Sequence, residues 1–301
     1  MTNVANGSPL GIVVVYYHPD EHCVQRANSF ADSGVCVVVD NTEQACSKRE
    51  LGLREKVQLI SNGANLGIAT ALNQGVRAVH DAGCDCVLLF DQDSEPSGEL
   101  LNELPRMLRA EAAAGRRVAL MGPAYEDARL GGVTPFVRFG FPALQRIAPV
   151  GTLPLQVDFL ITSGSCLNLA AWPAIGPMDE SLFIDFVDLE WCARARRAGF
   201  DLLGVPHIRL RHSLGGDPVR VLGRAYPSHS PLRHYYLFRN AVNLIGRGYM
   251  PWTWKWTELV KMPFRLVIYG VWLKPRTAHV KMAFLGIWHG LTGHMGALRG
   301  R

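Results

Sequence analysis

Short apolar runs that each end at a polar residue alternate with helical patterns, and this alternation limits the fold more than any other feature. Four of these runs have the length of buried parallel strands: 12–17, 35–39, 57–60 and 86–90. Helices are expected between and after them: from about residue 21, over 68–82 and over 98–114. Strands that alternate with helices predict an α/β fold with a doubly wound, mostly parallel sheet.

Polar side chains stand at or just past the carboxyl ends of these predicted strands. They are Asp40, Asn62, Asn65, Asp91 and Asp93. Open α/β sheets bind ligands outside the carboxyl ends of their strands, so we expect the five side chains to share one rim and form a nucleotide pocket. Each of them alone also suits a turn, and only the set points to a ligand. The sequence has neither a P-loop nor a G-x-G-x-x-G motif, which argues against ATPases and NAD(P)-dependent enzymes.

Asp91 and Asp93 are separated by one residue at the end of the apolar run 86–90. Alternate residues of a strand face the same way, so both carboxylates can approach one hard cation. Mg²⁺ and Mn²⁺ prefer such oxygen ligands, and Mg²⁺ is typically shared with substrate phosphates. The sequence therefore predicts a Mg²⁺ or Mn²⁺ site at this rim. A solvated acidic turn or a helix N-cap is the alternative.

Charge is divided sharply along the chain. Residues 1–193 carry 13 basic and 23 acidic side chains, whereas residues 194–301 carry 18 basic and 3 acidic ones. The basic C-terminal third predicts an anionic partner, either phosphate groups or anionic lipid. Nucleic acid is not expected, because the basic residues are spread over segments broken by proline and no recognised binding motif is present.

The sequence also indicates where the protein works. Its seven cysteines form no C-x-x-C pair, which predicts reduced thiols in a cytoplasmic protein. No signal peptide is visible, and the apolar stretch 266–273 is far short of the ~20 residues that span a bilayer. We therefore expect a cytoplasmic protein that lies peripherally on the inner face of the plasma membrane.

After about residue 123, the regular alternation of predicted strands and helices ends. Residues 124–157 suggest a long loop with short strands on the acceptor side, and the later elements are expected over 158–169, 185–198, 202–205 and 208–211. From Ser230 onward the pattern is helical, with breaks at Pro251, Pro263 and Pro275. These patterns predict one domain over 1–228, made of the halves 1–123 and 124–228, followed by a basic, Trp-rich helical region over 229–301.

Tryptophans are interleaved with Lys and Arg in this C-terminal region. They are Trp252, Trp254, Trp256, Trp272 and Trp288. Interfacial helices combine basic and Trp-rich faces, which favours contact with a membrane surface. The alternative is that the tryptophans pack onto the core or onto a second subunit of a homo-oligomer.

Several motifs occur in an order that resembles a known family. They are Asp40-Asn41, Asn65-Leu66-Gly67 with Asn73, Asp91-Gln92-Asp93-Ser94, Ser163-Gly164-Ser165, Asp185-Phe186-Val187-Asp188-Leu189-Glu190, His212-Ser213-Leu214-Gly215, Arg233 and Arg239-Asn240. With these motifs, the chain resembles family 2 glycosyltransferases of the GT-A fold, and within them the bacterial rhamnosyltransferases, over about residues 12–245. The broader family often has Glu-Asp where this chain has Val187-Asp188.

The resemblance implies inverting, metal-dependent transfer of rhamnose from dTDP-L-rhamnose to a hydroxyl of a saccharide or lipid-linked acceptor, in cell-surface polysaccharide or rhamnolipid synthesis. The half over 1–123 would bind the nucleotide sugar and the half over 124–228 the acceptor. Asp188 would be the general base. The metal ligands would be Asp91, Asp93 and His212, and the acceptor side would hold Ser163, Asp185 and Glu190. The donor would be bound by Asp40, Asn41, Asn62, Asn65, Gly67, Asn73, Asp91, Gln92 and Arg239.

Other interpretations stay open for single residues. Acids suit the first turn of a helix without any catalytic role, which is the alternative for Asp188. Arg239 either holds a phosphate or packs against Tyr235 and Tyr236, and residues 163–165 either donate backbone N–H groups to the substrate or form a tight turn. His212 is either a metal ligand or a structural residue.

Other functions stay open for the whole chain. Transfer of another nucleotide-activated hexose is one alternative. A sugar-nucleotide pyrophosphorylase would need a Gly-rich loop after the first strand, where this chain has Tyr16-Tyr17-His18-Pro19-Asp20. A catalytically inactive sugar-binding membrane scaffold is the last alternative, and the presence of Asp91, Asp93 and Asp188 argues against it.

Overall fold

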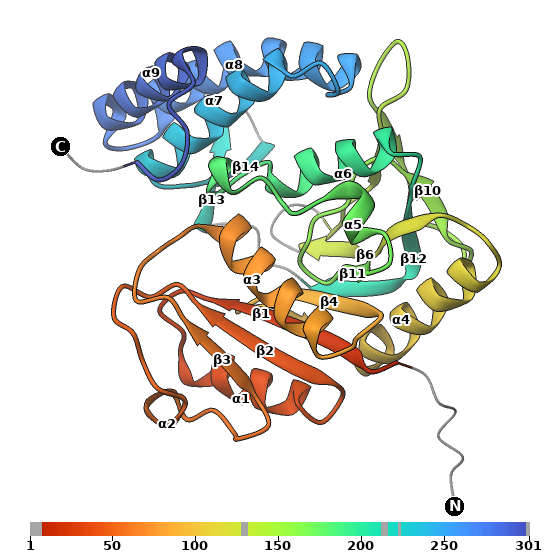
Figure 1. Ribbon diagram of the computed structural model, residues 1–301. Coiled ribbons are helices and arrows are strands. Elements are labelled where there is room, and N and C mark those ends of the chain that lie inside the picture. The colour runs from red at the N-terminus through yellow and green to blue at the C-terminus, as the bar shows by residue number, and fades with distance from the viewer. Residues whose placement is uncertain (1–7, 128–131, 212–215, 222–223, 299–301) are drawn as a thin grey trace, which may run out of the picture.

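A computed structural model of the protein describes residues 8–127, 132–211, 216–221 and 224–298 (Figure 1). The strands are β1 (Leu10–Tyr16), β2 (Val35–Asp40), β3 (Gln58–Ser61), β4 (Cys86–Asp91), β5 (Glu95–Pro96), β6 (Val118–Asp127), β7 (Gly132–Val133), β8 (Phe136–Arg138), β9 (Gln145–Ile147), β10 (Leu155–Val157), β11 (Cys166–Asn168), β12 (Asp201–Arg211), β13 (Gly216–Val221) and β14 (Arg224–Ser228). The helices are α1 (Glu21–Phe30), α2 (Lys48–Leu51), α3 (Ile68–Asp81), α4 (Gly98–Ala113), α5 (Trp172–Ile175), α6 (Val187–Arg197), α7 (Pro231–Gly246), α8 (Trp252–Trp272) and α9 (Arg276–Thr292), with a 3₁₀ turn at Glu180–Leu182.

One large sheet organises the molecule. Its strand order is β10-β12-β6-β11-β4-β1-β2-β3, with β5 paired to β12 and β7 to β6. Strands β4, β1, β2 and β3 are mutually parallel, and β6 and β12 are parallel to each other. The short strand β11 runs antiparallel between β4 and β6. The predicted α/β class with a mostly parallel sheet is confirmed, and the helical C-terminal region is present as α7–α9.

Helices cover both faces of the sheet because alternate strand residues point in opposite directions. Val13 and Val37 face one side, where they belong to the same buried cluster as Leu72 of α3 and Trp191 of α6. Ile12 faces the other side, where the cluster includes residues of α1 and α4. Strands that are apolar on both faces must be covered on both faces, which explains the continuous apolar runs of the sequence.

Four elements differ from the sequence-based prediction. The two short strands expected over 202–205 and 208–211 are one strand, β12, whose pairing with β6 is irregular between Val205 and Arg209. Pro206 lies in this irregular stretch, as is usual for proline in a sheet. The strand expected over 158–169 is reduced to β11, and β6 continues to Asp127 in place of a loop. Pro263 does not break α8: it is exposed, so water can solvate the carbonyl that its missing N–H leaves free.

The C-terminal helices pack closely on one another, above the sheet in Figure 1. A Cβ added at Gly286 of α9 would lie 2.4 Å from the backbone oxygen of Tyr235 in α7, and one at Gly290 would lie 2.6 Å from that of Arg239. The backbones of α7 and α9 therefore touch, and only glycine permits this approach. Phe238 of α7 shares a small core with Tyr269 of α8 and Ala283 of α9.

Candidate active site

The carboxyl ends of the first four parallel strands meet at one edge of the sheet. Tyr16 at the end of β1 lies opposite Asp40 in β2, and Asp40 lies opposite Ser61 in β3. On the other side of β1, Val15 lies opposite Asp91 at the end of β4. The strand register therefore brings the predicted polar rim together in space.

A cavity of about 480 Å³ opens at this edge. Four residues predicted to bind a donor line it: Asn41, Asn65, Asp91 and Gln92. The opposite wall comes from later in the chain and includes Phe183, Ile184, Ser230, Leu232, Arg233 and Tyr236. A second cavity of about 590 Å³ lies near the start of β4 and is lined in part by Cys84, Asp85 and Arg109. Because ligands of open α/β sheets sit at the carboxyl ends, the first cavity is the candidate active site.

Amide side chains fix the shape of the β2 and β3 ends. Asn41 Nδ2 donates to the oxygen of Gly67 at 3.0 Å, and Asn41 Oδ1 accepts from Asn62 Nδ2 at 2.8 Å. Asn62 and Gln74 exchange two further bonds, of 2.9 and 3.0 Å. Asn65 Oδ1 accepts from the Gly67 N–H at 3.1 Å. Asn62 thus supports the wall of the cavity from behind, whereas Asn41 and Asn65 reach it.

The side chain of Asp40 is fully buried, and only one of its two carboxylate oxygens is hydrogen-bonded within the described residues. Its Oδ1 accepts from the backbone N and the hydroxyl of Thr42, at 3.0 and 2.6 Å. Its Oδ2 is buried and has no hydrogen-bond partner in the part of the chain that the structure describes. Buried polar atoms are nearly always bonded, so this oxygen is a ready acceptor for a donor group of a ligand.

Gly67 and Asn73 both contact the loop over residues 178–183. Gly67 has φ of +87°, and a Cβ there would lie 2.6 Å from the ring and the backbone oxygen of Phe183. Asn73 is buried, and its side chain exchanges two bonds of 2.9 Å with the backbone of Met178 and donates to Glu180 at 2.9 Å. Neither residue lines the cavity, so the structure gives both a role in holding the opposite wall.

The Asp-Gln-Asp motif forms the turn after β4. Asp91 is partly exposed at the cavity, and the N–H of Ser94 donates to its backbone oxygen at 3.1 Å. Gln92 Oε1 accepts from the N–H of Tyr17 at 2.7 Å, which ties the motif to the end of β1. Asp93 is exposed, and among the described residues it has no hydrogen-bond or ion-pair partner. This freedom leaves the Asp93 carboxylate available to a ligand.

Ser163 supports this turn from behind. Its hydroxyl is 2.6 Å from the Ser94 hydroxyl and accepts from the Asp91 N–H at 3.3 Å. The backbone of Gly164 donates to Leu89 of β4 at 2.6 Å. Because Ser163 is buried and bonded in this way, the tight-turn interpretation fits residues 163–165 better than a substrate contact.

Asp188 lies in the first turn of α6 and is partly exposed. The N–H of Leu189 donates to its Oδ1 at 2.8 Å. Burial raises the pKa of Asp188 to about 7, and the neighbouring carboxylates of Asp185 and Asp91 raise it further. A carboxyl group whose pKa is raised toward neutral pH suits proton transfer. The effect of Asp91 on this pKa indicates that the end of β4 and the start of α6 lie near each other.

The other two acids of the predicted trio do not share the position of Asp188. Asp185 precedes α6 and has a φ of +64°, so it is not part of the helix, which was expected to begin at residue 185. Its carboxylate is paired with Arg233 of α7, with Nη2 3.0 Å and Nε 3.1 Å from Oδ1. Asp185 therefore neutralises a cation of the opposite wall.

Glu190 points away from the cavity into the protein. It is 1% exposed, and both its oxygens are bonded to Arg194, at 2.7 and 2.8 Å. The hydroxyl of Tyr249 donates to it at 2.5 Å. The expected acceptor-side role of Glu190 thus finds no support in its position, because its partners are structural.

Arg239 is fully buried under the loop that precedes α6. Its Nη2 donates to the oxygens of Leu182 at 2.8 Å and Ser181 at 3.2 Å, and Nη1 donates to Gly296. Its guanidinium lies 4.8 Å from the centre of the Tyr236 ring. The packing alternative therefore describes Arg239, which does not line the cavity.

Asn240 is the residue whose role could not be predicted from the sequence. Its Nδ2 donates to three oxygens of the loop, those of Leu182 (2.9 Å), Ile184 (2.7 Å) and Asp185 (3.0 Å). Phe183 and Asp185 in this loop, and Phe186 after it, have φ of +64°, a left-handed conformation that is costly for residues with side chains. Asn240 thus holds in place the strained segment that delivers Asp188. The only sequence signal was its place in the Arg239-Asn240 motif.

Replacement of Asn240 by Ala should therefore lower kcat by about 100-fold, the effect of misplacing a reacting group by roughly 1 Å. KM for the donor should change little, because Asn240 does not line the cavity. The control is Asn243→Ala, one turn later on α7, where the Asn243 side chain accepts from Arg247. Steady-state kinetics well below the melting temperature of each variant tests this, and equal kcat values for the two variants would contradict it.

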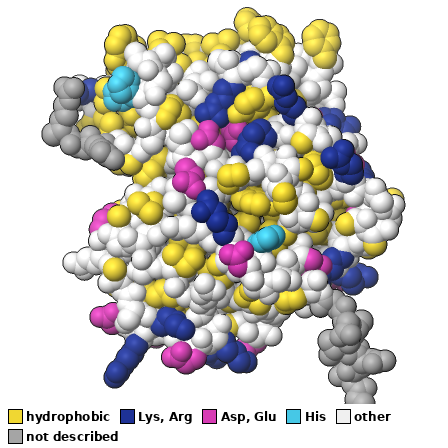
Figure 2. Space-filling view, in the orientation of Figure 1, with side chains coloured by type: hydrophobic (Ala, Val, Ile, Leu, Met, Phe, Trp, Pro, Cys, Tyr) yellow, Lys and Arg dark blue, Asp and Glu magenta, His cyan; other side chains and the backbone are white. Residues whose placement is uncertain are grey.

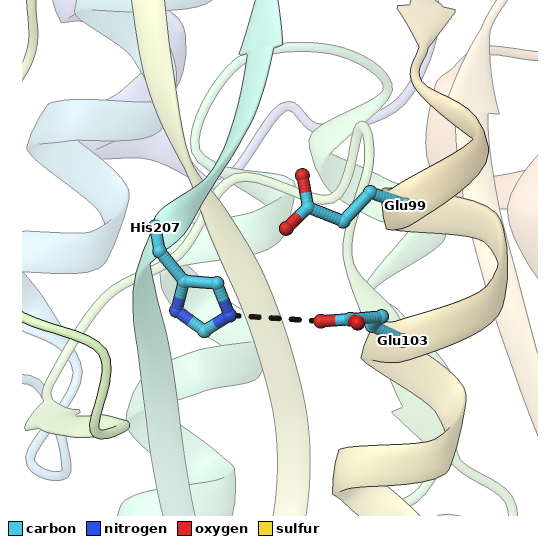
Figure 3. Close-up of side chains that lie close together, drawn as sticks. All are labelled: Glu99, Glu103 and His207. Atoms are coloured by element: carbon cyan, nitrogen blue, oxygen red, sulfur yellow. Dashed lines mark ion pairs between the residues drawn. The ribbon is translucent and has the colours of Figure 1, made fainter.

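The residues fit a divalent cation in part. Asp91 and Asp93 supply hard oxygen ligands. Burial is the main cause of the raised pKa of Asp188, and the negative charge of Asp91, which a cation would compensate, adds to it. His212, the third predicted ligand, lies outside the described residues. Among the described residues, the three His, Cys, Asp or Glu side chains whose ligand atoms lie within 4.8 Å of one another are Glu99, Glu103 and His207. Figure 3 shows this group between α4 and β12, and none of it lines the cavity.

Comparison with known proteins agrees with the geometry. The family model for "Glycosyl transferase family 2" matches residues 35–148. The chain is 31% identical to a Shigella flexneri protein named "dTDP-rhamnosyl transferase RfbF" over 95% of this chain and 97% of that protein. It is 22% identical to the Haloferax volcanii "Low-salt glycan biosynthesis hexosyltransferase Agl10", over 77% and 76% of the two chains.

Two solved structures share the fold. One is GalNAc-T7 with UDP, GalNAc and Mn²⁺, with a TM-score of 0.55 and 12% identity over 95% of this chain and 56% of that chain. The other is S. aureus TarS 1–349, with a TM-score of 0.52 and 13% identity over 95% and 81% of the two chains. At such low identity these likenesses establish the fold alone.

Proposed function

This chain belongs to glycosyl transferase family 2, and we propose that it transfers rhamnose from dTDP-L-rhamnose to an acceptor hydroxyl, with inversion at the anomeric carbon. The acceptor is a saccharide or a lipid-linked saccharide. The observation that carries the proposal is a cavity at the carboxyl edge of the sheet that Asp91 lines, with Asp188 near enough for the Asp91 carboxylate to raise its pKa. The identity of 31% over nearly the whole length with a protein named a dTDP-rhamnosyl transferase supports the choice of donor.

The donor fits the cavity with its nucleotide at the β1 and β2 ends. There, Asn41 and Asn65 line the wall. Asp40, which precedes Asn41 and does not itself line the cavity, has an unpaired Oδ2 that would accept from an N–H of the base. Asp91 and Asp93 would hold Mg²⁺ or Mn²⁺, with His212 as the third ligand expected from the sequence. When bound, the cation neutralises charge on the leaving diphosphate.

Asp188 takes the proton of the acceptor hydroxyl as that oxygen attacks the anomeric carbon. The bond to the nucleoside diphosphate breaks on the opposite face of the sugar. The hydrogen bond from the Leu189 N–H to Oδ1 fixes the Asp188 carboxylate. The hydrogen bonds that Asn240 donates fix the backbone that precedes Asp188. Arg233 of α7 lines the opposite wall of the cavity, and its ion pair with Asp185 ties α7 to the segment that precedes α6.

A panel of nucleotide sugars tests this assignment. The melting temperature of the protein with Mn²⁺ should rise more with dTDP-L-rhamnose than with UDP-glucose or GDP-mannose, because at equal concentration the ligand that binds the folded state more tightly stabilises it more. Asp40→Ala should reduce the shift with dTDP-L-rhamnose. A larger shift with UDP-glucose would favour transfer of another hexose. Transfer of another hexose is the main alternative because the Haloferax volcanii relative is named a hexosyltransferase.

We propose further that the protein acts as a peripheral protein on the cytoplasmic face of the plasma membrane, where lipid-linked saccharides are available. Among the residues described in Figure 1, no helix combines the length and the apolar character needed to cross a bilayer. The basic C-terminal third supports contact with anionic lipid head groups.

A further inference from the structure

Two helices near the C-terminus turn apolar side chains toward solvent, the reverse of an ordinary surface helix. Nine exposed residues recur three or four positions apart along them, and we call them the α8–α9 apolar face: Trp252, Trp256, Val260, Phe264, Val267 and Val271 in α8, and Phe284, Trp288 and Leu291 in α9. Their exposed fractions run from 43% to 72%. Figure 2 shows apolar side chains along the edge that α8 and α9 form in Figure 1.

The inward side of the same helices carries polar groups that are satisfied within the protein. Glu258 of α8 is 3% exposed and is bonded to Arg265 at 2.5 Å and Lys261 at 3.4 Å. His279 of α9 is also buried, with its Nδ1 2.9 Å from that of His234 in α7. The exposed apolar residues are therefore not needed for packing within the chain. Large contiguous exposed apolar surfaces mark sites of interaction.

Charge around the α8–α9 apolar face identifies the partner. Residues 251–292 carry six basic side chains and one acidic side chain, the buried Glu258. Lys261, Lys274, Arg276 and Lys281 are exposed. A second copy of the chain would bring equal positive charges together, whereas anionic lipid head groups complement them. Tryptophan and basic residues on one helix pair are typical of an interfacial membrane helix.

We propose that the α8–α9 apolar face docks this protein on the surface of an anionic lipid bilayer. Helix α8 lies on the surface and does not cross it, because Lys255, Glu258, Lys261 and Arg265 interrupt its apolar sequence. The apolar side chains enter the boundary between head groups and acyl chains, and the exposed lysines pair with phosphates.

Docking also orients the site. Helix α9 touches the backbone of α7 at Gly286 and Gly290, and α7 brings Leu232, Arg233 and Tyr236 to the cavity. The membrane-bound helices and one wall of the active site thus move as one packed unit, which presents the cavity to an acceptor anchored in the same bilayer. This consequence rests on the proposed function, whereas the docking itself does not.

Co-sedimentation of the full chain with phosphatidylcholine vesicles, with and without phosphatidylglycerol, tests the docking. Binding should require phosphatidylglycerol and weaken with salt, since charge is screened within about 3 Å at 1 M salt against about 10 Å at 0.1 M. Each lysine near the surface strengthens binding by about fivefold, so Lys274→Gln with Lys281→Gln should weaken it by about 30-fold. The matched control is Arg49→Gln with Lys56→Gln, two exposed cations in α2 and just before β3, elements that lie at the other end of the molecule from α8 in Figure 1. This control should change binding by less than about twofold.

An apolar pair of variants tests the other half of the proposal. Trp256→Ser with Phe264→Ser should weaken vesicle binding by at least about tenfold, given the apolar area removed, whereas Leu153→Ser, at a residue 77% exposed elsewhere, should not. Equal binding to neutral and anionic vesicles, or none, would overturn the proposal. So would a dimer in sedimentation analysis that Trp256→Ser with Phe264→Ser converts to monomer, because a second copy would then cover the face. Asp188→Asn should bind vesicles as the wild type does, which separates failure of docking from failure of the proposed catalysis.

Discussion

Asp188→Asn is expected to lower turnover by about 10²–10⁴-fold, the usual contribution of a general base. The substitution keeps the size of the side chain, and Oδ1 can still accept the N–H of Leu189. It removes the basic oxygen at a position where burial raises the pKa of the carboxyl to about 7. Donor affinity should be nearly unchanged, because Asp188 acts on the acceptor hydroxyl. Single-turnover rates at saturating donor, with donor affinity measured separately, give the two quantities.

Glu190→Gln is the matched control for this variant, because it removes a charge two residues away on the same helix. Glu190 is buried and bonded to Arg194 and Tyr249, so its loss should destabilise the fold by about 1–3 kcal/mol without a specific effect on turnover. If Asp188→Asn retains near-normal turnover while Glu190→Gln is inactive though folded, the general base is the wrong acid. If Asp188→Asn instead loses donor affinity and keeps its rate at saturation, the residue belongs to the nucleotide site.

Asp93→Ala should lower the metal-dependent rate by about 10³-fold, since a bound cation contributes several kcal/mol to charge stabilisation in the transition state. The fold should survive, because Asp93 is exposed in the turn after β4. Rates measured across a titration of Mn²⁺ and after EDTA treatment, together with the melting temperature, check both statements. Full activity of Asp93→Ala in EDTA would contradict the assignment.

The cluster of Glu99, Glu103 and His207 provides the control for the metal site. His207 Nε2 lies 3.7 Å from Glu103 Oε2, so this group is the competing place for a cation (Figure 3). Glu103→Gln should leave the rate and its dependence on Mn²⁺ unchanged. If Glu103→Gln abolishes the metal dependence while Asp93→Ala preserves it, the functional cation is bound between α4 and β12.

Much of the sheet could be predicted because its strands are short, apolar on both faces and separated by regular helices. Asp40 and Asp91 end their strands as the sequence predicts, and parallel pairing with β1 then places them on one edge. The positions of these strands and of their last residues can be predicted from local sequence, because each depends on an apolar run of only five or six residues. The antiparallel insertion of β11 between β4 and β6 could not be found in the same way, because a three-residue strand has no period of its own.

Side-chain roles were harder to predict than their positions. Asp185, Asp188 and Glu190 look alike in the sequence, but their surroundings differ. Asp185 pairs with Arg233, Asp188 accepts from the N–H of Leu189, and Glu190 turns into the core, after left-handed residues that precede α6. Arg239 and Asn73 were expected at the donor, and both are instead buried in contacts with the loop over 178–185. These contacts join residues more than 50 positions apart, which no local pattern records.

The rate of nucleoside diphosphate release from dTDP-L-rhamnose, compared with UDP-glucose and GDP-mannose, tests the central claim most directly. Each donor is supplied at equal concentration with Mn²⁺ and with a lipid-linked saccharide extract as acceptor. We expect the fastest release from dTDP-L-rhamnose, dependence on the acceptor and on Mn²⁺, and loss of the signal in Asp188→Asn. Faster release from UDP-glucose or GDP-mannose, or a dTDP-L-rhamnose rate that Asp188→Asn leaves intact, would contradict the account.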